Sequence, residues 1–519
     1  MSGPDKKKRT WRETMTVWMH PKVQVMLFLG FSAGIPFSLI FFTLSVWLTE
    51  AGVERSTVTF FSWASLGYSF KFIWAPLVDR MPLPLLTRRL GRRRSWLLSA
   101  QLLIIVSIIW MALVNPSHGA GSLTTMAVGA VLLGFAAATQ DIVIDAYRIE
   151  CVDTSMQALL SSMYIAGYRL GMMFAGAGAL FLATLFGTRM ESYHYSAWSS
   201  TYLAMAVAMT LGVATTLLIQ EPEKKTRPVA GVYTTSHYIR FLGLFLLVVT
   251  LFAVTFFFSA APAKHVKDAL AAQLSVNGKS LVDFAVEAFR LGMALFAAVA
   301  GVRVALIAGM VDRKMVFDTY VDPVRDFFTR YGVRTAILLL TLVGFYKISD
   351  IVLGVVSNIF YLDMGFSKNV IAGVTKVYGV GMTVLGGFLG GILTVKFGVY
   401  RILFLGAFLS VIANLLFMLL AGGAADIGML TMVIAFDNLS AGLAATAFVA
   451  FLSSLTNVSF TAVQYALFSS MMTLFPKLIG GYSGEIVTAW GYRPFFLLTA
   501  SMGIPVLALV WMARDVVES

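Results

Sequence analysis

Residues 71–80 read KFIWAPLVDR, and residues 91–94 read GRRR. Long apolar runs lie on both sides, so these charged residues mark a loop at which two membrane spans meet water. Cations at such a loop can cap helix C-termini and pair with carboxylates on neighbouring helices, while glycine allows helices to approach closely. A similar loop, GGILTVKFGVYR at 390–401, follows much later in the chain but lacks the aspartate. Loops at matching places predict two related halves.

Composition places the chain among integral membrane proteins. Of its 519 residues, 58% are hydrophobic and 13% are charged, and the mean hydropathy is +0.82, outside the range of a soluble domain. The single cysteine, Cys151, excludes an internal disulfide framework and a multi-cysteine metal site. The net charge is +13, but the basic residues gather at span ends, which favours membrane orientation over nucleic-acid binding.

Apolar segments long enough to cross a bilayer recur along the whole chain. We expect about fourteen spans, arranged six, two and six. They lie near 22–49, 56–79, 93–114, 122–147, 156–186, 197–219, 237–260, 284–310, 335–361, 368–395, 401–422, 427–455, 460–486 and 494–513. The predicted fold is all-α integral membrane: a major facilitator fold with two six-helix halves and about two additional helices inserted between them.

Basic clusters predict the orientation. Those at 6–12, 88–94, 224–227 and 313–334 fall on one side, whereas the loops at 115–121, 187–196 and 362–367 are poor in Lys and Arg. The positive-inside rule therefore places both termini in the cytoplasm. The predicted divisions are a cytoplasmic tail at 1–20, a first half at 21–220, a linker with an inserted hairpin at 221–334, a second half at 335–514 and a cytoplasmic tail at 515–519.

The first loop departs from the superfamily's signature loop, because Ala75-Pro76 stands in place of a glycine and an extra stretch at 82–84 precedes Gly91. With these departures, the chain resembles the AmpG muropeptide permeases of bacterial inner membranes. The segments that carry the resemblance are 70–80, 91–98, 138–146, 167–172, 346–350, 447–452 and 460–467. It covers nearly all of 20–220 and 335–513 and leaves out the two additional helices.

The resemblance implies a secondary transporter that imports N-acetylglucosaminyl-anhydro-N-acetylmuramyl peptides from periplasm to cytoplasm by proton symport. It implies roles in peptidoglycan recycling and in β-lactamase induction. The expected place is the bacterial inner (plasma) membrane, and the expected partners are muropeptide, protons and membrane lipids, with the protein as a monomer. The sequence contains no phosphate-cradling loop, nucleophile elbow or His-Glu-x-x-His motif, so no enzymatic activity, cofactor or metal is expected.

Three acids inside predicted spans are the proton-coupling candidates, because a coupled carrier needs a carboxylate that changes charge within a cavity. They are Asp141, Asp350 and Asp437. Lys347 lies three residues before Asp350, so the two can form a static pair. Alternatively the pair is a switch that opens when Asp350 takes up a proton or Lys347 binds a substrate carboxylate.

Arg169 lies about a dozen residues into the fifth span, where a guanidinium needs a wet cavity or a carboxylate. It can grip a substrate carboxylate through two hydrogen bonds, or form a structural ion pair with Asp141. Polar and aromatic side chains can bind sugar hydroxyls and ring faces, although each is also ordinary in helix packing. The substrate-binding candidates are Lys71, Gln140, Tyr164, Arg169, Lys347, Gln464 and Tyr465, with Trp74 and Phe436 as further stacking residues.

Asp141 and Asp145 lie one helical turn apart in the run QDIVIDAYR at 140–148. Asp145 with Arg148 is closer to the cytoplasmic end, which favours a latch with the basic loop after span two. The predicted cytoplasmic gate consists of Asp79, Arg80, Arg92, Arg93, Arg94, Asp145 and Arg148. Asp141 then remains a candidate for coupling, shared with Arg169, Lys347 and Asp350.

Other functions remain open from the sequence. An acetyl-CoA or other organic-anion transporter would share the fold, but the phosphates of coenzyme A call for a denser cluster of cations. An integral membrane transferase acting on lipid-linked sugars would need a metal-binding carboxylate cluster or a loop nucleophile, and neither motif is present. A sensor without transport activity would be expected to lose the charges inside the spans.

Overall fold

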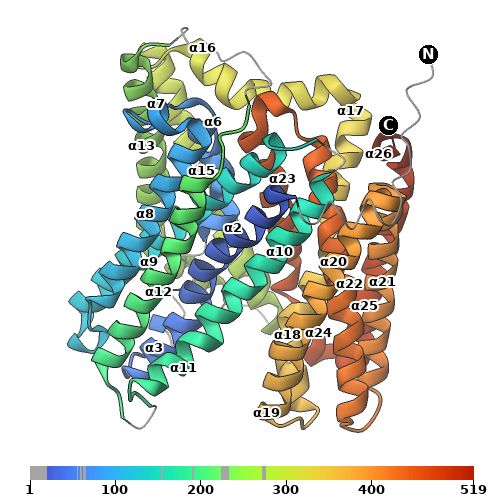
Figure 1. The fold of residues 1–519 in the computed structure, drawn as a ribbon. Coiled ribbons are helices and arrows are strands. Elements are labelled where there is room, and N and C mark those ends of the chain that lie inside the picture. Colours follow the sequence, from blue (N-terminus) through green and yellow to red (C-terminus); the bar gives the residue numbers. More distant parts are fainter. Residues whose placement is uncertain are drawn as a thin grey trace. The chain divides into compact units, whose positions relative to one another are not determined.

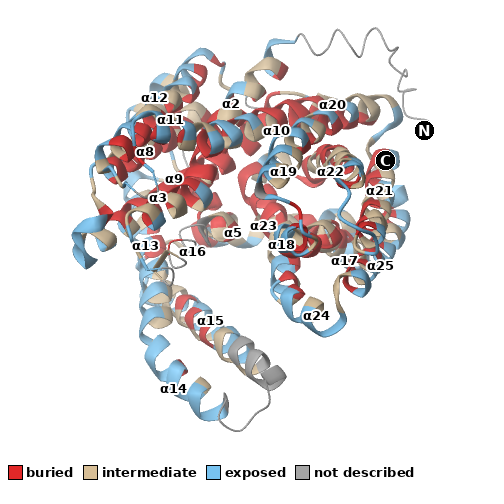
Figure 2. Cartoon of the chain, turned by 90° about the horizontal axis from the view of Figure 1, so that it is seen from below, coloured by how far each residue is buried: buried red, intermediate tan, exposed pale blue. Residues whose placement is uncertain are grey.

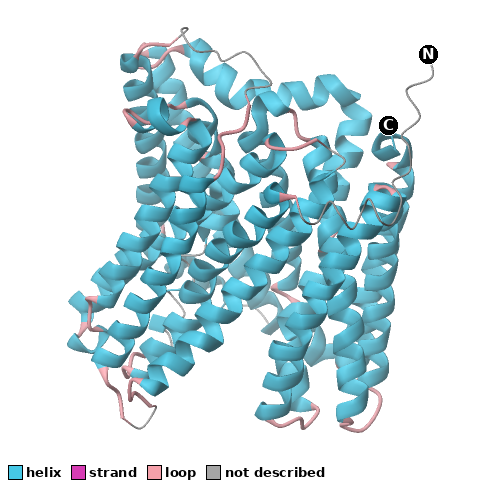
Figure 3. Ribbon diagram, in the orientation of Figure 1, coloured by secondary structure: helices cyan, strands magenta, loops and turns pink. Residues whose placement is uncertain are grey.

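The computed structural model describes residues 20–54, 57–58, 61, 66–153, 156–189, 192–223, 233–271 and 276–518. These residues are helical apart from loops and one isolated bridge between Arg189 and Ser192 (Figure 3). Thirteen helices in the described ranges are long and apolar enough to cross a membrane. The predicted all-α membrane class is therefore confirmed.

Some sequence predictions fall outside the described residues. These are the basic cluster at 6–12, the cluster at 224–227 and much of the first part of the expected span at 56–79. The second part of that span contains α5 (Leu66–Phe70), a 3-10 turn (Lys71–Ile73) and α6 (Ala75–Arg80).

The chain forms two compact units. One comprises Met1–Thr226 with Phe327–Ser519, and the other is Arg227–Asp326. The smaller unit contains α13 (Thr235–Phe258), α14 (Ala260–Ala271), α15 (Val276–Ile307) and α16 (Arg313–Val316). Within it, Glu287 accepts hydrogen bonds from Lys267 (2.8 Å) and Arg290 (2.7 Å), so one carboxylate is shared by two cations.

The larger unit contains the N-terminal and the C-terminal helix bundles, which we call its two halves (Figure 1). Besides α5 and α6, the N-terminal half contains α2 (Pro21–Ser38), α3 (Leu44–Glu50), α7 (Leu86–Leu90), α8 (Arg92–Ala112), α9 (Ala120–Glu150), α10 (Gln157–Met173), α11 (Ala179–Leu185) and α12 (Tyr195–Leu218). The C-terminal half contains α17 (Asp322–Phe345), α18 (Ile348–Asp363), α19 (Lys368–Ile371), α20 (Gly379–Phe397), α21 (Val399–Leu420), α22 (Ile427–Leu455), α23 (Thr461–Gly480), α24 (Ser483–Trp490), α25 (Tyr492–Met512) and α26 (Arg514–Glu518).

Glycines bring α2 and α10 into backbone contact. A Cβ atom at Gly30 would lie 2.2 Å from the carbonyl oxygen of Tyr164, and one at Gly34 would lie 2.1 Å from that of Tyr168. From the other helix, Gly167 and Gly171 approach α2 equally closely. Each pair is spaced four residues apart, the pattern that lets membrane helices cross without side chains between them. This close contact holds α10, the helix that carries Tyr164 and Arg169, against α2.

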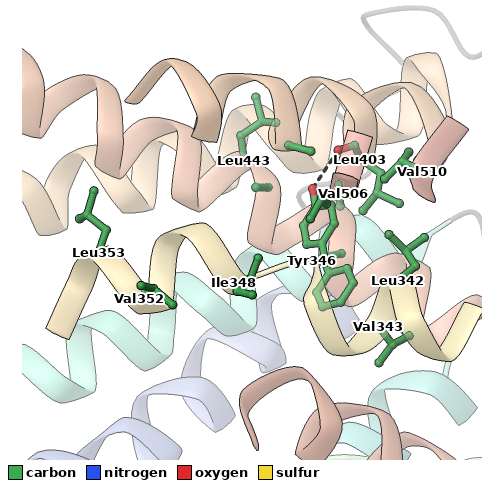
Figure 4. Packing of buried hydrophobic residues seen from close by; sticks show 14 of the residues in the cluster. Leu342, Val343, Tyr346, Ile348, Val352, Leu353, Leu403, Leu443, Val506 and Val510 are labelled. Carbon is green, nitrogen blue, oxygen red and sulfur yellow. Dashed lines mark hydrogen bonds between the residues drawn. The ribbon is translucent and has the colours of Figure 1, made fainter. Parts of the chain in front are cut away.

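The C-terminal half packs around an apolar core in which Tyr346 is central (Figure 4). The Tyr346 hydroxyl donates a hydrogen bond to the carbonyl oxygen of Leu403 (2.8 Å), and its ring stacks on Phe448 at 4.3 Å between centroids. Figure 2 shows buried residues on the inner sides of the bundle helices, while outer sides are exposed. Large apolar side chains such as Ile504 and Trp511 are among the exposed ones, as expected for surfaces that face lipid.

Candidate functional site

Two spans of the larger unit are interrupted at a lysine. Lys71 begins the 3-10 turn between α5 and α6, and Lys347 lies between α17 and α18 with non-helical dihedral angles of −96° and 11°. Within a membrane, interrupted helices are tolerated where the backbone is buried in protein or lines a cavity. Transporters use such breaks to bind ions and substrates. The breaks therefore mark two places at which charged side chains can meet an ion or a substrate.

In the N-terminal half, Asp145 lies between two cations. The Lys71 ammonium is 3.6 Å from its carboxylate, and the Arg148 guanidinium is 3.3 Å away. Arg148 is fully buried and also donates to Gln157 (3.2 Å) and Ser161 (3.0 Å). Lys71 is thus turned toward Asp145 and not free for a ligand.

Asp141, one turn earlier on α9, has no ion-pair partner among the residues that the structure describes. Its carboxylate accepts one hydrogen bond, from the Tyr164 hydroxyl at 3.3 Å. Rings gather on this side of the half: Tyr164 lies 6.0 Å from Tyr168, and Phe37 lies 6.0 Å from Tyr168 and 5.8 Å from Tyr68. Sequence reasoning missed Tyr68 and Tyr168. The spacing of Tyr164 and Tyr168, four residues apart on one helix face, was the signal that could have found Tyr168.

Arg169 lies near the middle of the 29-residue span Gln157–Leu185. Within the described part of the chain, its guanidinium makes no ion pair and no hydrogen bond. The structural pair with Asp141 that the sequence left open is not formed. A guanidinium without a protein partner at such a position is costly unless water or a ligand meets it.

The other binding candidates are placed differently. The Gln140 side chain is fully buried, and neither its nitrogen nor its oxygen has a hydrogen-bond partner among the described residues. The Gln464 oxygen accepts from Arg330 (3.1 Å) and from the backbone of Asn457 (2.7 Å). The Tyr465 ring lies under Arg148 at 5.1 Å. Gln464 and Tyr465 therefore lie at the start of α23, where the two halves meet.

Trp74, a predicted stacking residue, makes its contacts within the N-terminal half. Its indole nitrogen donates to Thr139 (3.0 Å), and its ring lies 4.9 Å from that of Phe135. This is ordinary helix packing.

In the C-terminal half, Lys347 and Asp350 form an ion pair at 2.9 Å. The second oxygen of Asp350 accepts a hydrogen bond from Ser410 on α21. Asp437 on α22 is close enough for both charges to act on it, yet it makes no hydrogen bond or ion pair with any described residue. Three of the predicted charges therefore form one group on α18, α22 and the break before α18.

At one end of the larger unit, charged residues join the two halves. The Asp79 carboxylate is 2.7 Å from Arg93 in its own half and accepts a hydrogen bond from the backbone nitrogen of Val463 in the other half (3.0 Å). Val463 lies in the first turn of α23, where backbone donors lack intrahelical partners. The Arg80 guanidinium lies 5.7 Å from the Phe460 ring centroid, and Arg148 donates to Ser453 at 2.8 Å.

The remaining gate candidates bond within the N-terminal half. Arg92 donates to the carbonyl oxygen of Asp79 (2.6 Å), and Arg94 to that of Leu217 (2.6 Å). Two acids that sequence reasoning missed complete the network: Glu150 is 2.5 Å from Arg93, and Glu221 accepts from the backbone nitrogens of Arg93 and Arg94. The position of Glu221 directly after span six, opposite a triple-arginine loop, was the available signal.

A helical membrane protein with two bundles joined at one end, and with charges within its spans, has the construction of a secondary transporter. Residues 26–361 match the Major Facilitator Superfamily. The chain is 30% identical over 482 residues to the putative transporter AmpG 4 of Rickettsia conorii, covering 93% of this chain and 94% of that protein. It is 27% identical over 505 residues to the anhydromuropeptide permease of Escherichia coli K12, covering 97% and 82%. The chain belongs to the major facilitator superfamily and, within it, to the AmpG group of transporters.

Solved structures give the same fold. The proton:xylose symporter XylE matches with a TM-score of 0.56 at 12% identity, covering 96% of this chain and 95% of that one. As a member of the major facilitator superfamily and of the AmpG group, the protein is a multi-pass membrane transporter and not an enzyme.

Proposed function

We propose that this transporter imports anhydromuropeptides into the cytoplasm by proton symport across the bacterial inner membrane. The observation that carries the proposal is the Arg169 guanidinium, which has no partner among the described residues and lies mid-span. A peptide carboxylate would complete its hydrogen bonds through two parallel contacts. The name of the Escherichia coli relative supports the choice of cargo.

The sugar part of the cargo would lie against the rings near Asp141. Tyr68, Tyr164, Tyr168 and Phe37 offer ring faces of the kind that cover apolar sugar faces. Gln140, whose buried amide has no partner among the described residues, can exchange hydrogen bonds with acetamido or hydroxyl groups once the site rearranges. Trp74 and Gln464 have other partners and are left out of the proposed site.

The coupling would use the C-terminal group. Lys347 and Asp350 neutralise each other in this structure. A proton on Asp350 would release the Lys347 ammonium, which could then bind a cargo carboxylate. Asp437, beside the pair, can receive the proton on its way through. Asp141 is a second coupling candidate because it has a tyrosine hydroxyl as its partner and no cation.

The orientation follows from charge. The end at which Asp79, Arg80 and Arg148 join the halves is also the end with the basic loops, which the positive-inside rule assigns to the cytoplasm. We infer that the structure has its cytoplasmic gate closed and its periplasmic side available to cargo, with both termini in the cytoplasm.

An acetyl-CoA transporter is less well supported by these contacts. Of the three cations proposed to meet an anionic cargo, Lys71 and Lys347 are already paired with acids, which leaves Arg169. One free guanidinium matches a peptide carboxylate better than the several phosphate charges of coenzyme A.

Uptake into proteoliposomes tests the proposal. We expect saturable uptake of labelled N-acetylglucosaminyl-anhydro-N-acetylmuramyl tripeptide that unlabelled muropeptide competes with and acetyl-CoA does not. Competition by acetyl-CoA at equal concentration, or no saturable muropeptide uptake by folded protein, would refute the assignment of cargo.

A further inference from the structure

Arg330 makes contacts that the gate described above does not include. It lies near the kink of α17 at Gly332 (φ 71°). Its Nη2 atom donates to the carbonyl oxygen of Leu455 and to the side-chain oxygen of Gln464, both at 3.1 Å. Its guanidinium also lies 5.1 Å from the centroid of the Tyr331 ring. Although Arg330 is exposed, the two acceptors of these hydrogen bonds belong to buried residues.

The two acceptors lie on either side of one short connection. Leu455 is the last residue of α22, where carbonyl groups lack intrahelical partners and attract cations. Gln464 lies in the first turn of α23, and its oxygen also accepts from the backbone of Asn457 (2.7 Å). A single guanidinium therefore ties together the end of one helix and the start of the next.

This connection carries the C-terminal side of the gate. Phe460 lies under Arg80, Val463 donates to Asp79, and Tyr465 lies under Arg148. Gln464 is the immediate neighbour of the last two. Any change in the path of the chain between Leu455 and Gln464 would move these three contacts together.

We propose that Arg330 is a positioning residue of the transport cycle: it holds the α22–α23 connection in the shape that closes against the N-terminal half. Its hydrogen bonds to Leu455 and Gln464 hold this connection without any cargo. The proposal therefore goes beyond the assignment of muropeptide import and stays testable if the cargo is another molecule.

The labelling rate of a cysteine placed at the buried interface between the two halves measures how often the gate opens. Ser162 on α10 is fully buried, and a Cβ atom at Gly391 on α20 would lie 2.7 Å from its hydroxyl, so opening of the gate must expose this position. We would place Ser162→Cys in a Cys151→Ser background and measure the rate of maleimide labelling in purified protein without cargo.

Arg330→Ala should raise the labelling rate about two- to fivefold, the shift expected from losing a cation at a helix C-terminus. The labelling rate of Arg330→Lys should lie between those of the parent protein and Arg330→Ala, because a point charge cannot reach both acceptors with the fixed geometry of a guanidinium. Arg334→Ala is the matched control. It removes an exposed arginine in the same helix that has no hydrogen bond or ion pair in the described ranges, and it should leave the rate unchanged.

Gln464→Leu is a second variant, which keeps the proposal testable if the Arg330→Ala protein does not fold. It should raise the labelling rate by itself. The double variant Arg330→Ala, Gln464→Leu should label more slowly than the product of the two single effects predicts, since both changes remove the Arg330–Gln464 contact and each also removes contacts of its own. Labelling of folded Arg330→Ala at the parent rate would overturn the proposal. A rate in the double variant equal to the product of the two single effects would overturn it as well.

Discussion

Arg169 is the charged side chain whose lack of a partner most directly implies a ligand. Replacing it with glutamine should raise the KM for muropeptide uptake about tenfold or more, because a carboxylate in a desolvated site loses its charge-assisted hydrogen bonds. Stability should be retained, since the described residues lose no ion pair. Uptake kinetics and the thermal unfolding temperature measure the two effects, with Arg334→Gln as the control for a lost charge. An unchanged KM in the Arg169 variant would show that the guanidinium does not meet the cargo.

The burial of Cys151, directly after α9, leads to a prediction about the pH dependence of its labelling. Burial raises the pKa of its thiol to about 12. The thiolate is the reactive form, so a raised pKa leaves less of it at neutral pH, and the labelling rate should climb as pH rises toward that value. The native protein at pH 7.5 should react with N-ethylmaleimide about a thousandfold more slowly than the denatured chain, judged against an ordinary thiol pKa. Intact-mass measurement follows the reaction, and equal rates in the two states would contradict the burial of this thiol.

The α2–α10 crossing depends on the absence of side chains at four glycines. Gly34→Ala would push a methyl group against the carbonyl oxygen of Tyr168, which lies 2.1 Å from the Cβ position. Overpacking of this kind should cost about 1–3 kcal/mol and lower the unfolding temperature by several degrees. Gly354→Ala on α18 is the control, because its Cβ position has nothing within 4 Å. Equal unfolding temperatures for both variants would mean that the helices can separate without loss.

The sequence predicted the helices much better than their interruptions. Apolar length and basic loops are properties of composition, so the thirteen spans in the described ranges and the two halves could be expected. The breaks at Lys71 and Lys347 and the π-helical turns Phe174–Gly178 and Ala372–Tyr378 could not. A break shifts a few backbone hydrogen bonds and leaves hydropathy unchanged.

Partners were predicted where they lie close in sequence. Lys347 with Asp350, three residues apart, and Arg148 with Asp145 are the examples. Glu221 with Arg93, or Arg330 with Gln464, required distances between helices far apart in the chain. For the same reason the sequence could not show that Arg169 would be left without an acid.

Transport requires the two halves to separate at the gate during each cycle. Ser162 and Gly391 face each other across the halves, with the Cβ position of Gly391 lying 3.1 Å from the Cβ atom of Ser162. That is slightly closer than a disulfide needs, so a small shift would let a cysteine pair form one. With Cys151→Ser as background, oxidation of the Ser162→Cys, Gly391→Cys variant should nearly abolish uptake, and a reductant should restore it.

Single-cysteine variants control for oxidative damage in that experiment. Full uptake by a quantitatively cross-linked protein would mean that this interface does not open during transport.

Gradient-dependent uptake decides whether this transporter is coupled to protons. Labelled anhydromuropeptide would be presented to proteoliposomes with and without an imposed gradient, using the unaltered chain, Asp141→Asn, Lys347→Ala and Asp350→Asn. We predict accumulation above equilibrium only with the gradient, collapse of that accumulation by a protonophore, and loss of gradient dependence in Asp350→Asn. Accumulation by the unaltered chain that is independent of the gradient would contradict proton symport, and near-normal driven uptake in all three variants would contradict the proposed site.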